Sequence, residues 1–541
     1  MHLKLRQAVI AAAGTLLLTT GLNAIADSTT DIVNALISKG VLTEEEGALI
    51  TRGRTDEVDV QKKKEKKFST NAVKFRGYVQ TRNTTMLNGD EGVNLWSDRS
   101  VGDDKSLGDA DKNFLIRRAR LIVYGDVGDH LSYYIQPDFA SSVGGTSNSN
   151  VNGSNNFAQL RDAYGDIYVD KERVHRVRVG QSKVPFGFEN MQSSSNRLAL
   201  DRVDALNSAV RDERDLGAFY YYTPKATQEL FEEINKAGLK HSGNYGMFAL
   251  GAYNGQGANA RDQNDNYHVV SRFTYPWKTA SGQIYEAGIQ AYKGEYITTT
   301  GAYSRRNPRN GTLQSTTPST LAALTPSTIN NAGVIVPSVS AATNLARSLT
   351  NGLPLANPNV ALSNRNGITD ERVGISFMMY PQPFGIMAEW NWGHTPGLDV
   401  ARNRIEEQNL NGGYVQAMYK IDNVKFLGTD STVIPFIKYQ YFDGYNKAEL
   451  NAPKNKVHDW ELGVEWQVAP EVEISAVYHI MNRTNLVTGN RINRGVGATP
   501  AALAAATATI NAANAASNLP AREDYENFSA DALRIQVQYN F

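Results

Sequence analysis

The sequence predicts an all-β fold, a 16-stranded antiparallel transmembrane β-barrel with a short N-terminal helical segment before it. Three observations predict this fold. The N-terminus has the pattern of an export signal, no apolar run of eighteen or more residues follows it, and apolar and polar residues alternate from residue 68 onward. A helical membrane protein is therefore excluded, whereas strands with one apolar face are favoured.

The first 26 residues predict a secretory signal peptide. Basic residues precede an apolar stretch at 8–18, and Ala24-Ile25-Ala26 has the small-x-small form of a cleavage site. We expect cleavage before Asp27. A single membrane anchor is the alternative interpretation, but the apolar stretch is short for a helix that crosses a bilayer.

The composition excludes several kinds of site. The chain has no cysteine, which excludes disulfides and thiolate metal sites. Lysine plus arginine and aspartate plus glutamate number 55 each; without Lys4 and Arg6 the mature chain has 53 against 55, a net charge near −2. This balance indicates no nucleic-acid partner. The 26 tyrosines and 45 glycines are typical of a barrel with aromatic girdles.

Residues 27–67 differ from the rest of the chain. They combine apolar residues at helical spacing, a capping box in which Thr43 precedes three glutamates, and a charged run from Lys62 to Lys67. One or two short helices on a periplasmic tether are predicted. The lysine run is interpreted as a solvated spacer, and recruitment of phosphate or contact with another envelope polymer is the alternative. The apolar residues are Ile32, Leu36, Ile37 and Val41.

Residues 68–541 form the predicted outer-membrane barrel. In the last segment the odd-numbered residues from Leu533 to Phe541 are apolar and the even-numbered residues from Arg534 to Asn540 are polar. One face of such a strand contacts outer-membrane lipid and the other faces the lumen. A strand of a soluble sandwich also alternates, but it rarely ends the chain on an aromatic residue with a fully polar opposite face.

Segments of this kind predict sixteen strands. The number is even, as a barrel with both chain ends on one side requires, and about ten residues suffice for a tilted strand to cross the bilayer. Short and long connections alternate, as periplasmic turns alternate with extracellular loops; the turn near 225–243 is unusually long. The strands are 73–86, 113–127, 131–140, 157–169, 175–187, 215–224, 244–255, 266–278, 283–298, 370–381, 384–395, 412–422, 431–446, 457–469, 471–484 and 531–541.

Sixteen strands enclose a lumen too wide for side chains to fill, so it is either an aqueous channel or blocked by a loop. The third long connection, Phe188–Arg214, is expected to fold inward as a constriction. Its four basic and five acidic residues give a net charge of −1. An ordinary surface loop is the alternative.

The alternation also places arginines on the lumen side. Ala119 and its apolar neighbours face lipid, which puts Arg118 and Arg120 inside. Arg117 then has lipid-facing parity, at a cost of roughly 2–4 kcal/mol at mid-bilayer, so it must lie near the rim or past a bulge. Arg176 and Arg178 share the inward parity and extend the basic track; the alternative is that these arginines pair with Asp162 and Asp166 across the wall.

Three motifs resemble the phosphate-selective porin O and P family: Ile116–Leu121, Val179–Gly187 and the pair Asp201-Arg202. The similarity spans residues 68–541 in strand layout, and the motifs cluster between 113 and 217. The resemblance implies a trimeric barrel with an inward third loop, a ladder of pore-lining arginines and phosphate as substrate.

The resemblance also implies the residues of an anion site. Guanidinium groups match phosphate oxygens, serine hydroxyls complete the shell, and a carboxylate orients the cations so that the ion can leave. The family's lysine cluster at the outer mouth has no counterpart, because the long loops contain few lysines. The residues implied are Arg117, Arg118, Asp138, Ser193, Ser194, Ser195 and Arg202.

No motif indicates an enzyme, a cofactor or a metal. There is no phosphate-cradling glycine loop, no metalloprotease motif and no nucleophile elbow, and the eight histidines lack ligand spacing. A calcium loop at 262–266 is conceivable, but a polar loop explains that segment more simply. The sequence predicts an outer-membrane porin, and the resemblance implies a homotrimer that passes small anions such as phosphate.

Two alternatives remain open. A weakly selective general porin is favoured by the nearly neutral third loop. A barrel-anchored surface or adhesive protein is favoured by the low-complexity loops at 299–369 and 485–530.

Overall fold

A computed structural model describes the barrel and a few residues before it. The described residues are 37–39, 43–45, 73–89, 112–140, 158–300, 304–306, 313–315, 327–329, 335–337, 366–399, 404–426, 428–486 and 525–541. The chain divides into two compact units, Met1–Val73 and Lys74–Phe541. In the first unit Ile37 and Ser38 are helical, as are Glu44 and Glu45. The signal peptide and the rest of segment 27–67 lie outside the described residues.

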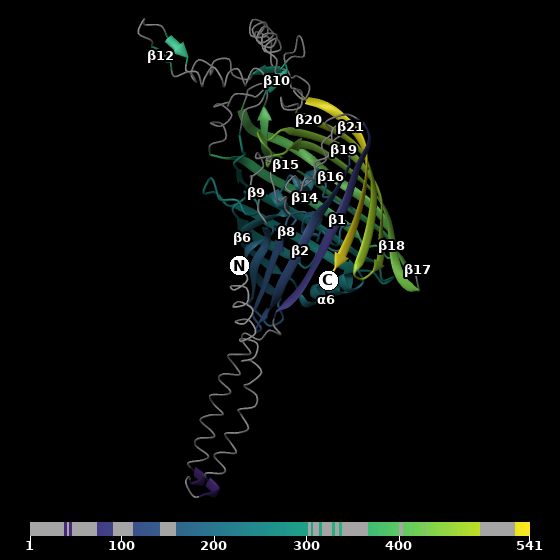
Figure 1. Cartoon of the computed structure of the whole chain (residues 1–541). Helices are drawn as coiled ribbons and strands as arrows, with labels where there is room; N and C mark the ends of the chain where they lie inside the picture. Colours follow the sequence, from purple (N-terminus) through teal and green to yellow (C-terminus); the bar gives the residue numbers. More distant parts are fainter. Residues whose placement is uncertain are drawn as a thin grey trace, which may run out of the picture. The chain divides into compact units, whose positions relative to one another are not determined.

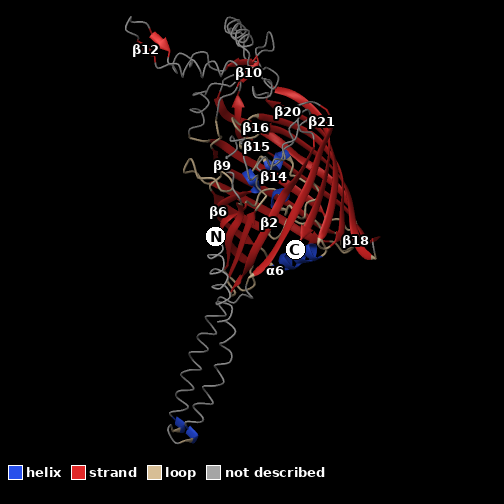
Figure 2. Cartoon of the chain, viewed as in Figure 1, coloured by secondary structure: helices blue, strands red, loops and turns tan. Residues whose placement is uncertain are grey.

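Long antiparallel strands close into one barrel (Figure 1; Figure 2). Each strand pairs with its neighbours in chain order, β9 pairs with β14, and β21 returns to β1 to complete the ring. The strands are β1 (Lys74–Gly89), β2 (Lys112–Val127), β3 (Leu131–Asp138), β4 (Gln159–Tyr168), β5 (His175–Lys183), β6 (Arg214–Tyr222), β7 (Phe248–Tyr253), β8 (His268–Lys278), β9 (Ile284–Tyr296), β14 (Ile368–Met379), β15 (Phe384–Asp399), β16 (Arg404–Tyr419), β17 (Ile421–Phe426), β18 (Thr429–Tyr445), β19 (Lys454–Ala469), β20 (Val472–Leu486) and β21 (Tyr525–Asn540).

The seventeen strands of this sheet make a sixteen-stranded barrel. Strand β16 pairs with residues 436–443 of β18, and β17 pairs with residues 429–433 of the same strand. Strand β17 is therefore the continuation of β16 after an irregularity, and the two count as one strand of the barrel. The predicted strand number and the predicted antiparallel closure are confirmed. Four short strands lie in the loop that follows β9 and pair as two hairpins, β10 (Ser304–Arg306) with β11 (Leu313–Ser315) and β12 (Ser327–Ile329) with β13 (Ile335–Pro337). The rest of that low-complexity loop, and most of 485–530, lies outside the described residues.

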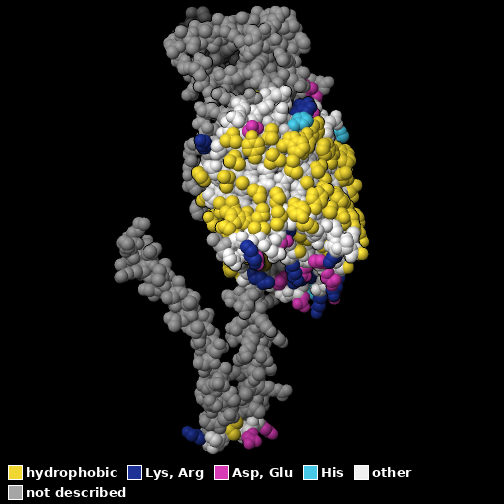
Figure 3. All heavy atoms as spheres, turned by 90° about the vertical axis from the view of Figure 1, so that its right-hand side faces the viewer, with side chains coloured by type: hydrophobic (Ala, Val, Ile, Leu, Met, Phe, Trp, Pro, Cys, Tyr) yellow, Lys and Arg dark blue, Asp and Glu magenta, His cyan; other side chains and the backbone are white. Residues whose placement is uncertain are grey.

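The outer face of the barrel carries an apolar belt (Figure 3). Large apolar side chains are exposed at alternate positions of most strands, while polar side chains of the opposite parity are buried in the lumen. In β21, for example, Ile535 and Tyr539 are exposed while Arg534 and Gln536 are buried, as the alternation predicted. On the face shown in Figure 3, charged side chains gather at the ends of the belt. This pattern matches a lipid-facing surface.

The long connection between β6 and β7 folds back into the end of the barrel. It contains helix α6 (Lys225–Lys236), whose Phe231 and Ile234 are buried. Lys240 forms a buried ion pair with Glu465 of β19. The connection that looked too long for a periplasmic turn is long because it carries this helix. No helix in the described part of the chain has the length and apolar character needed to cross a membrane.

Candidate constriction and anion-binding site

The connection between β5 and β6, residues 184–213, lies inside the barrel and is called loop 3 below. It contains α4 (Phe188–Met191), α5 (Asp204–Asn207) and the 3-10 turn η3 (Arg211–Glu213). Figure 2 shows these helices within the ring of strands. Loop 3 reaches distant parts of that ring, because Ser194 bonds Tyr78 of β1 at 2.7 Å and Ala205 accepts from Arg372 of β14 at 2.7 Å. The third connection is therefore folded inward, as predicted.

Apolar packing fixes one side of loop 3. Its buried residues Leu198, Val203 and Leu206 belong to one cluster with inward side chains of β14 to β20, among them Met387 and Phe436. A lumen-facing strand residue is normally polar in a water-filled barrel. Loop 3 and the β6–β7 connection, whose Phe231 and Ile234 belong to the same cluster, together explain the inward apolar residues on this arc.

Carboxylates and a lysine fix the start of α4. Glu389 of β15 accepts from the backbone N–H groups of Phe188 at 2.6 Å and Glu189 at 2.9 Å. Glu189 itself pairs with Lys438 of β18 at 2.5 Å and accepts from the Val203 N–H at 2.9 Å. A helix start has unpaired N–H groups, and Glu389 satisfies two of them. Loop 3 is thus held to the β15–β18 wall by buried polar contacts as well as by packing.

The opposite side of loop 3 presents Asp201 to a group of arginines. Asp201 lies 2.8 Å from Arg82 of β1, 3.3 Å from Arg117 and 4.0 Å from Arg118 of β2, and 2.7 Å from Arg534 of β21. We call these five residues the Asp201 cluster. Four guanidiniums from β1, β2 and β21 thus surround one carboxylate of loop 3. Although burial alone would raise the pKa of Asp201, Arg82, Arg117 and Arg534 lower it well below its ordinary value.

Several guanidinium nitrogens at this place lack a hydrogen-bond partner. Among the described residues none is found for Nε of Arg118, for Nε and Nη1 of Arg197, or for Nε and Nη2 of Arg534. Arg197 of loop 3 interacts electrostatically with Asp201 as well. Buried donors without an acceptor are costly, and an anion is the ligand that satisfies them.

A β-bulge brings Arg117 to the lumen. The register of β1 against β2 shifts between Gln80, which faces Arg118, and Thr81, which faces Ile116, so Arg117 is the extra residue. Arg117 and Arg118 are both buried, at 7% and 5% exposed. The sequence placed Arg117 at the rim or past a bulge, and the structure has the bulge. Two adjacent strand residues can share a face only through such an irregularity.

Arg120 joins Asp138 and Ser194 in a second group. Its Nε donates to Asp138 at 2.7 Å, and its Nη1 donates to the Tyr78 hydroxyl at 2.8 Å and to Ser194 Oγ at 3.0 Å. Ser193 and Ser195 instead bond each other at 2.8 Å on the exposed side of the loop. Of the three predicted hydroxyls, the structure therefore brings only Ser194 to the arginines.

Arg176 and Arg178 face the lumen but lie in a separate group. Arg178 makes two bonds to Asp166, at 2.7 and 2.8 Å, and its guanidinium lies 3.7 Å from the ring centre of Tyr164. Arg176 lies 3.5 Å from the same carboxylate. The contacts favour the alternative that these arginines pair across the wall. Arg214 also forms an ion pair with a carboxylate of the neighbouring wall, at 3.0 Å from Asp162.

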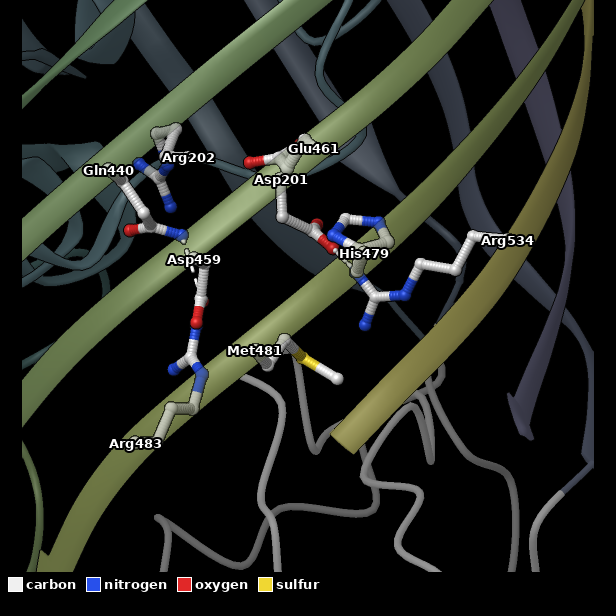
Figure 4. A pocket seen from close by; sticks show the side chains of 9 residues that line it. All are labelled: Asp201, Arg202, Gln440, Asp459, Glu461, His479, Met481, Arg483 and Arg534. Atoms are coloured by element: carbon white, nitrogen blue, oxygen red, sulfur yellow. Dashed lines mark hydrogen bonds and ion pairs between the residues drawn. The ribbon is translucent and has the colours of Figure 1, made fainter. Parts of the chain in front are cut away.

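Arg202 and Asp201 both line a cavity between loop 3 and the barrel wall. Arg202 pairs with Glu213 at 2.7 Å, and burial with the nearby Arg197 lowers its pKa well below the ordinary arginine value. Figure 4 shows the cavity, where Asp201 and Arg202 from loop 3 meet side chains of β18 to β21. Those side chains include Asp459, Glu461, His479 and Arg534.

Sequence reasoning missed Arg82, Arg534 and the anchors Glu389 and Lys438. Arg534 has a usable signal, because it lies on the polar face of the last predicted strand. Arg82 joins it only because the first and last strands are neighbours in the closed barrel, where Thr84 faces Arg534. Glu389 and Lys438 contact loop 3 only because of the path that the loop takes inside the barrel, and no local sequence pattern indicates that path.

A model of the family described as phosphate-selective porin O and P matches residues 92–338 and 309–493. The two matches together span residues 92–493, which is 402 of 541. A search of curated proteins finds no match.

Several solved structures are similar to the chain at low identity. The outer membrane channel DcaP of Acinetobacter baumannii is 13% identical with a TM-score of 0.41, over 87% of this chain and 97% of that one. An anion-selective porin from Comamonas acidovorans is 11% identical with a TM-score of 0.41, over 87% and 99%. OprB of Pseudomonas putida is 9% identical with a TM-score of 0.41, over 87% and 94%.

Proposed function

Because this chain belongs to the family of phosphate-selective porins O and P, and is an outer-membrane porin, we propose that it passes small anions, with inorganic phosphate as the preferred ion. The protein acts as a passive channel rather than as an enzyme. We further propose a homotrimer, which the resemblance to the family implies.

The observation that carries this proposal is the gathering of four guanidiniums in the Asp201 cluster. Four guanidiniums of the barrel wall contact one loop 3 carboxylate within the lumen. Beside them, among the described residues, guanidinium nitrogens of Arg118, Arg197 and Arg534 lack hydrogen-bond partners. At a separation of about 5 Å and an effective dielectric constant of about 20, each unit charge attracts a monovalent anion by roughly 3 kcal/mol before screening by water and salt. Such a field concentrates anions at the constriction and repels cations.

The carboxylates next to the arginines support release of the ion. Asp201 holds the guanidiniums in place, and Asp138 neutralises Arg120. A channel must bind its ion strongly enough to admit it and weakly enough to let it leave. Compensation by Asp201 and Asp138 limits the binding free energy and so keeps a bound anion mobile.

Phosphate block of chloride current in planar bilayers tests this proposal. We expect millimolar phosphate to reduce chloride conductance of the wild type, and the double variant Arg118→Ala, Arg120→Ala to lose most of that block while still inserting as a channel. Arg173→Ala removes a partly exposed arginine of the β4–β5 turn and serves as the control. An unblocked wild-type current would contradict the phosphate proposal.

A weakly selective general porin is the second candidate. It is favoured by the pairing of many other lumen arginines, for example Arg178 with Asp166 and Arg483 with Asp204. Each such pair is neutral and adds little to an anion preference. This candidate predicts similar conductance in phosphate and chloride and no block by phosphate.

A further inference from the structure

We infer that the cavity between loop 3 and strands β18 to β21 is a specificity site for small oxyanions that carry a proton, such as hydrogen phosphate. In this site Glu461 accepts the hydrogen bond from the ligand's own hydroxyl group. The inference rests on the proposed function, because it concerns which anion the same passage prefers. It assigns a role to a carboxylate in a passage otherwise characterised by its arginines.

The strand register places Glu461 at the centre of the cavity wall. In β19, Glu461 faces Lys438 of β18 on one side and His479 of β20 on the other. Lys438 is engaged by Glu189 of loop 3 at 2.5 Å. Two residues along β19, Asp459 is engaged by Arg483 at 2.5 Å. Lys438 and Arg483, two cations of the neighbouring strands, thus already have carboxylate partners other than Glu461.

Polar atoms without partners point into this cavity from neighbouring strands (Figure 4). Among the described residues, no hydrogen-bond partner is found for Oε2 of Glu461, Nε2 of His479, or Nε and Nη2 of Arg534. These residues are only 4%, 6% and 2% exposed. A buried carboxylate oxygen without a donor is costly, so the site is complementary to a ligand that brings one.

The charged groups around the cavity suit a ligand that both donates and accepts hydrogen bonds. The lining contains three carboxylates and three guanidiniums, so it has no net charge of its own: Asp201, Asp459 and Glu461 against Arg202, Arg483 and Arg534. The free nitrogens of Arg534 donate to anionic oxygens, whereas Glu461 in its ionised form accepts hydrogen bonds. A small ligand that carries anionic oxygens beside an O–H group matches both.

Hydrogen phosphate and sulfate differ in this one property. Both are tetrahedral and of similar size, but near neutral pH phosphate retains a proton and sulfate does not. The phosphate O–H can donate to Glu461, whereas a sulfate oxygen at the same place meets a carboxylate without a bridging proton and is repelled. Glu461 thus rejects fully deprotonated oxyanions and admits protonated ones.

The ratio of phosphate to sulfate permeability, measured from bi-ionic reversal potentials in planar bilayers, tests the inference. We expect the wild type to favour phosphate by about tenfold, which corresponds to one charge-assisted hydrogen bond. Glu461→Gln supplies an amide donor and should bring the ratio close to one. Glu371→Gln removes the same charge from a half-buried residue paired with Lys293 and His394, outside the cavity, and should leave the ratio unchanged.

The outcomes separate this inference from the proposed function. A wild type in which phosphate blocks chloride current but phosphate and sulfate permeate equally overturns the inference, whereas the anion passage of the proposed function stands. An unchanged ratio of phosphate to sulfate permeability in Glu461→Gln also overturns the inference. The inference is overturned as well if the cavity binds only a small zwitterion, which would be seen as a block by glycine that Glu461→Gln abolishes. A cation-selective wild type overturns the proposed function and the inference together. Because the wild-type ratio is itself decisive, a failure of the variant to assemble leaves the test intact.

Discussion

Replacing Asp201 by asparagine tests how the Asp201 cluster sets the strength of anion binding. The change keeps the size of the side chain but removes the one negative charge among Arg82, Arg117, Arg118 and Arg534. The net charge at the cluster becomes one unit more positive. We expect phosphate to bind more tightly and to leave more slowly.

The size of the effect follows from Coulomb's law. An anion about 5 Å from the lost carboxylate gains roughly 3 kcal/mol at an effective dielectric constant of about 20. Water and salt in the lumen reduce this gain, and about half of it, roughly 1.5 kcal/mol, corresponds to tenfold tighter binding. The blocking concentration of phosphate should therefore fall about tenfold in Asp201→Asn.

Titration of phosphate against chloride current measures this concentration. Asp212→Asn is the matched control, because it neutralises a loop 3 carboxylate that is 41% exposed and 3.7 Å from Arg161, outside the cluster. Heat-modifiability on gels checks that the barrel remains folded. A folded Asp201→Asn channel with unchanged or weaker block would refute the reasoning, and so would an equal effect in Asp212→Asn.

Three further results are expected. Because the arginines hold the pKa of Asp201 well below its ordinary value, its carboxylate stays ionised, and the difference in anion selectivity between the wild type and Asp201→Asn should be constant between about pH 5 and pH 8; a difference that vanishes toward pH 5 would contradict the assignment. Lys240→Met leaves Glu465 as an unpaired buried charge and should cost about 3–5 kcal/mol of stability, measured as a lower temperature of heat-modification, whereas Lys236→Met, in an exposed helical pair, should cost under about 1 kcal/mol. Replacing residues 225–240 by a short turn removes the helix that folds into one end of the barrel and should raise single-channel conductance; an unchanged conductance would show that the segment does not obstruct the passage.

The barrel itself could be predicted from the sequence because its main determinant is local. Alternation along each strand is a two-residue pattern, and the boundary between lipid and lumen acts on every strand in the same way. The same pattern indicated the bulge at Arg117, because two adjacent arginines conflict with it. It also indicated the inward loop 3, although only through the width of a sixteen-stranded lumen.

The details of the site could not be predicted because they depend on contacts between distant segments. Ser194 and Ser193 are equivalent in sequence, yet only Ser194 meets Arg120, because the path of loop 3 decides which hydroxyl faces the wall. The pairing of Arg178 with Asp166 was one of two open interpretations, since parity gives the face of a side chain but not its partner. The α6 segment was visible only as a turn of unusual length.

The most direct test of the central claim is the reversal potential of the wild-type channel across a gradient of potassium chloride. The guanidinium groups that gather around loop 3 predict a potential of the sign that anion permeation produces, with chloride more permeant than potassium. A potential of the opposite sign, or none, would contradict the claim that the Asp201 cluster controls which ions pass.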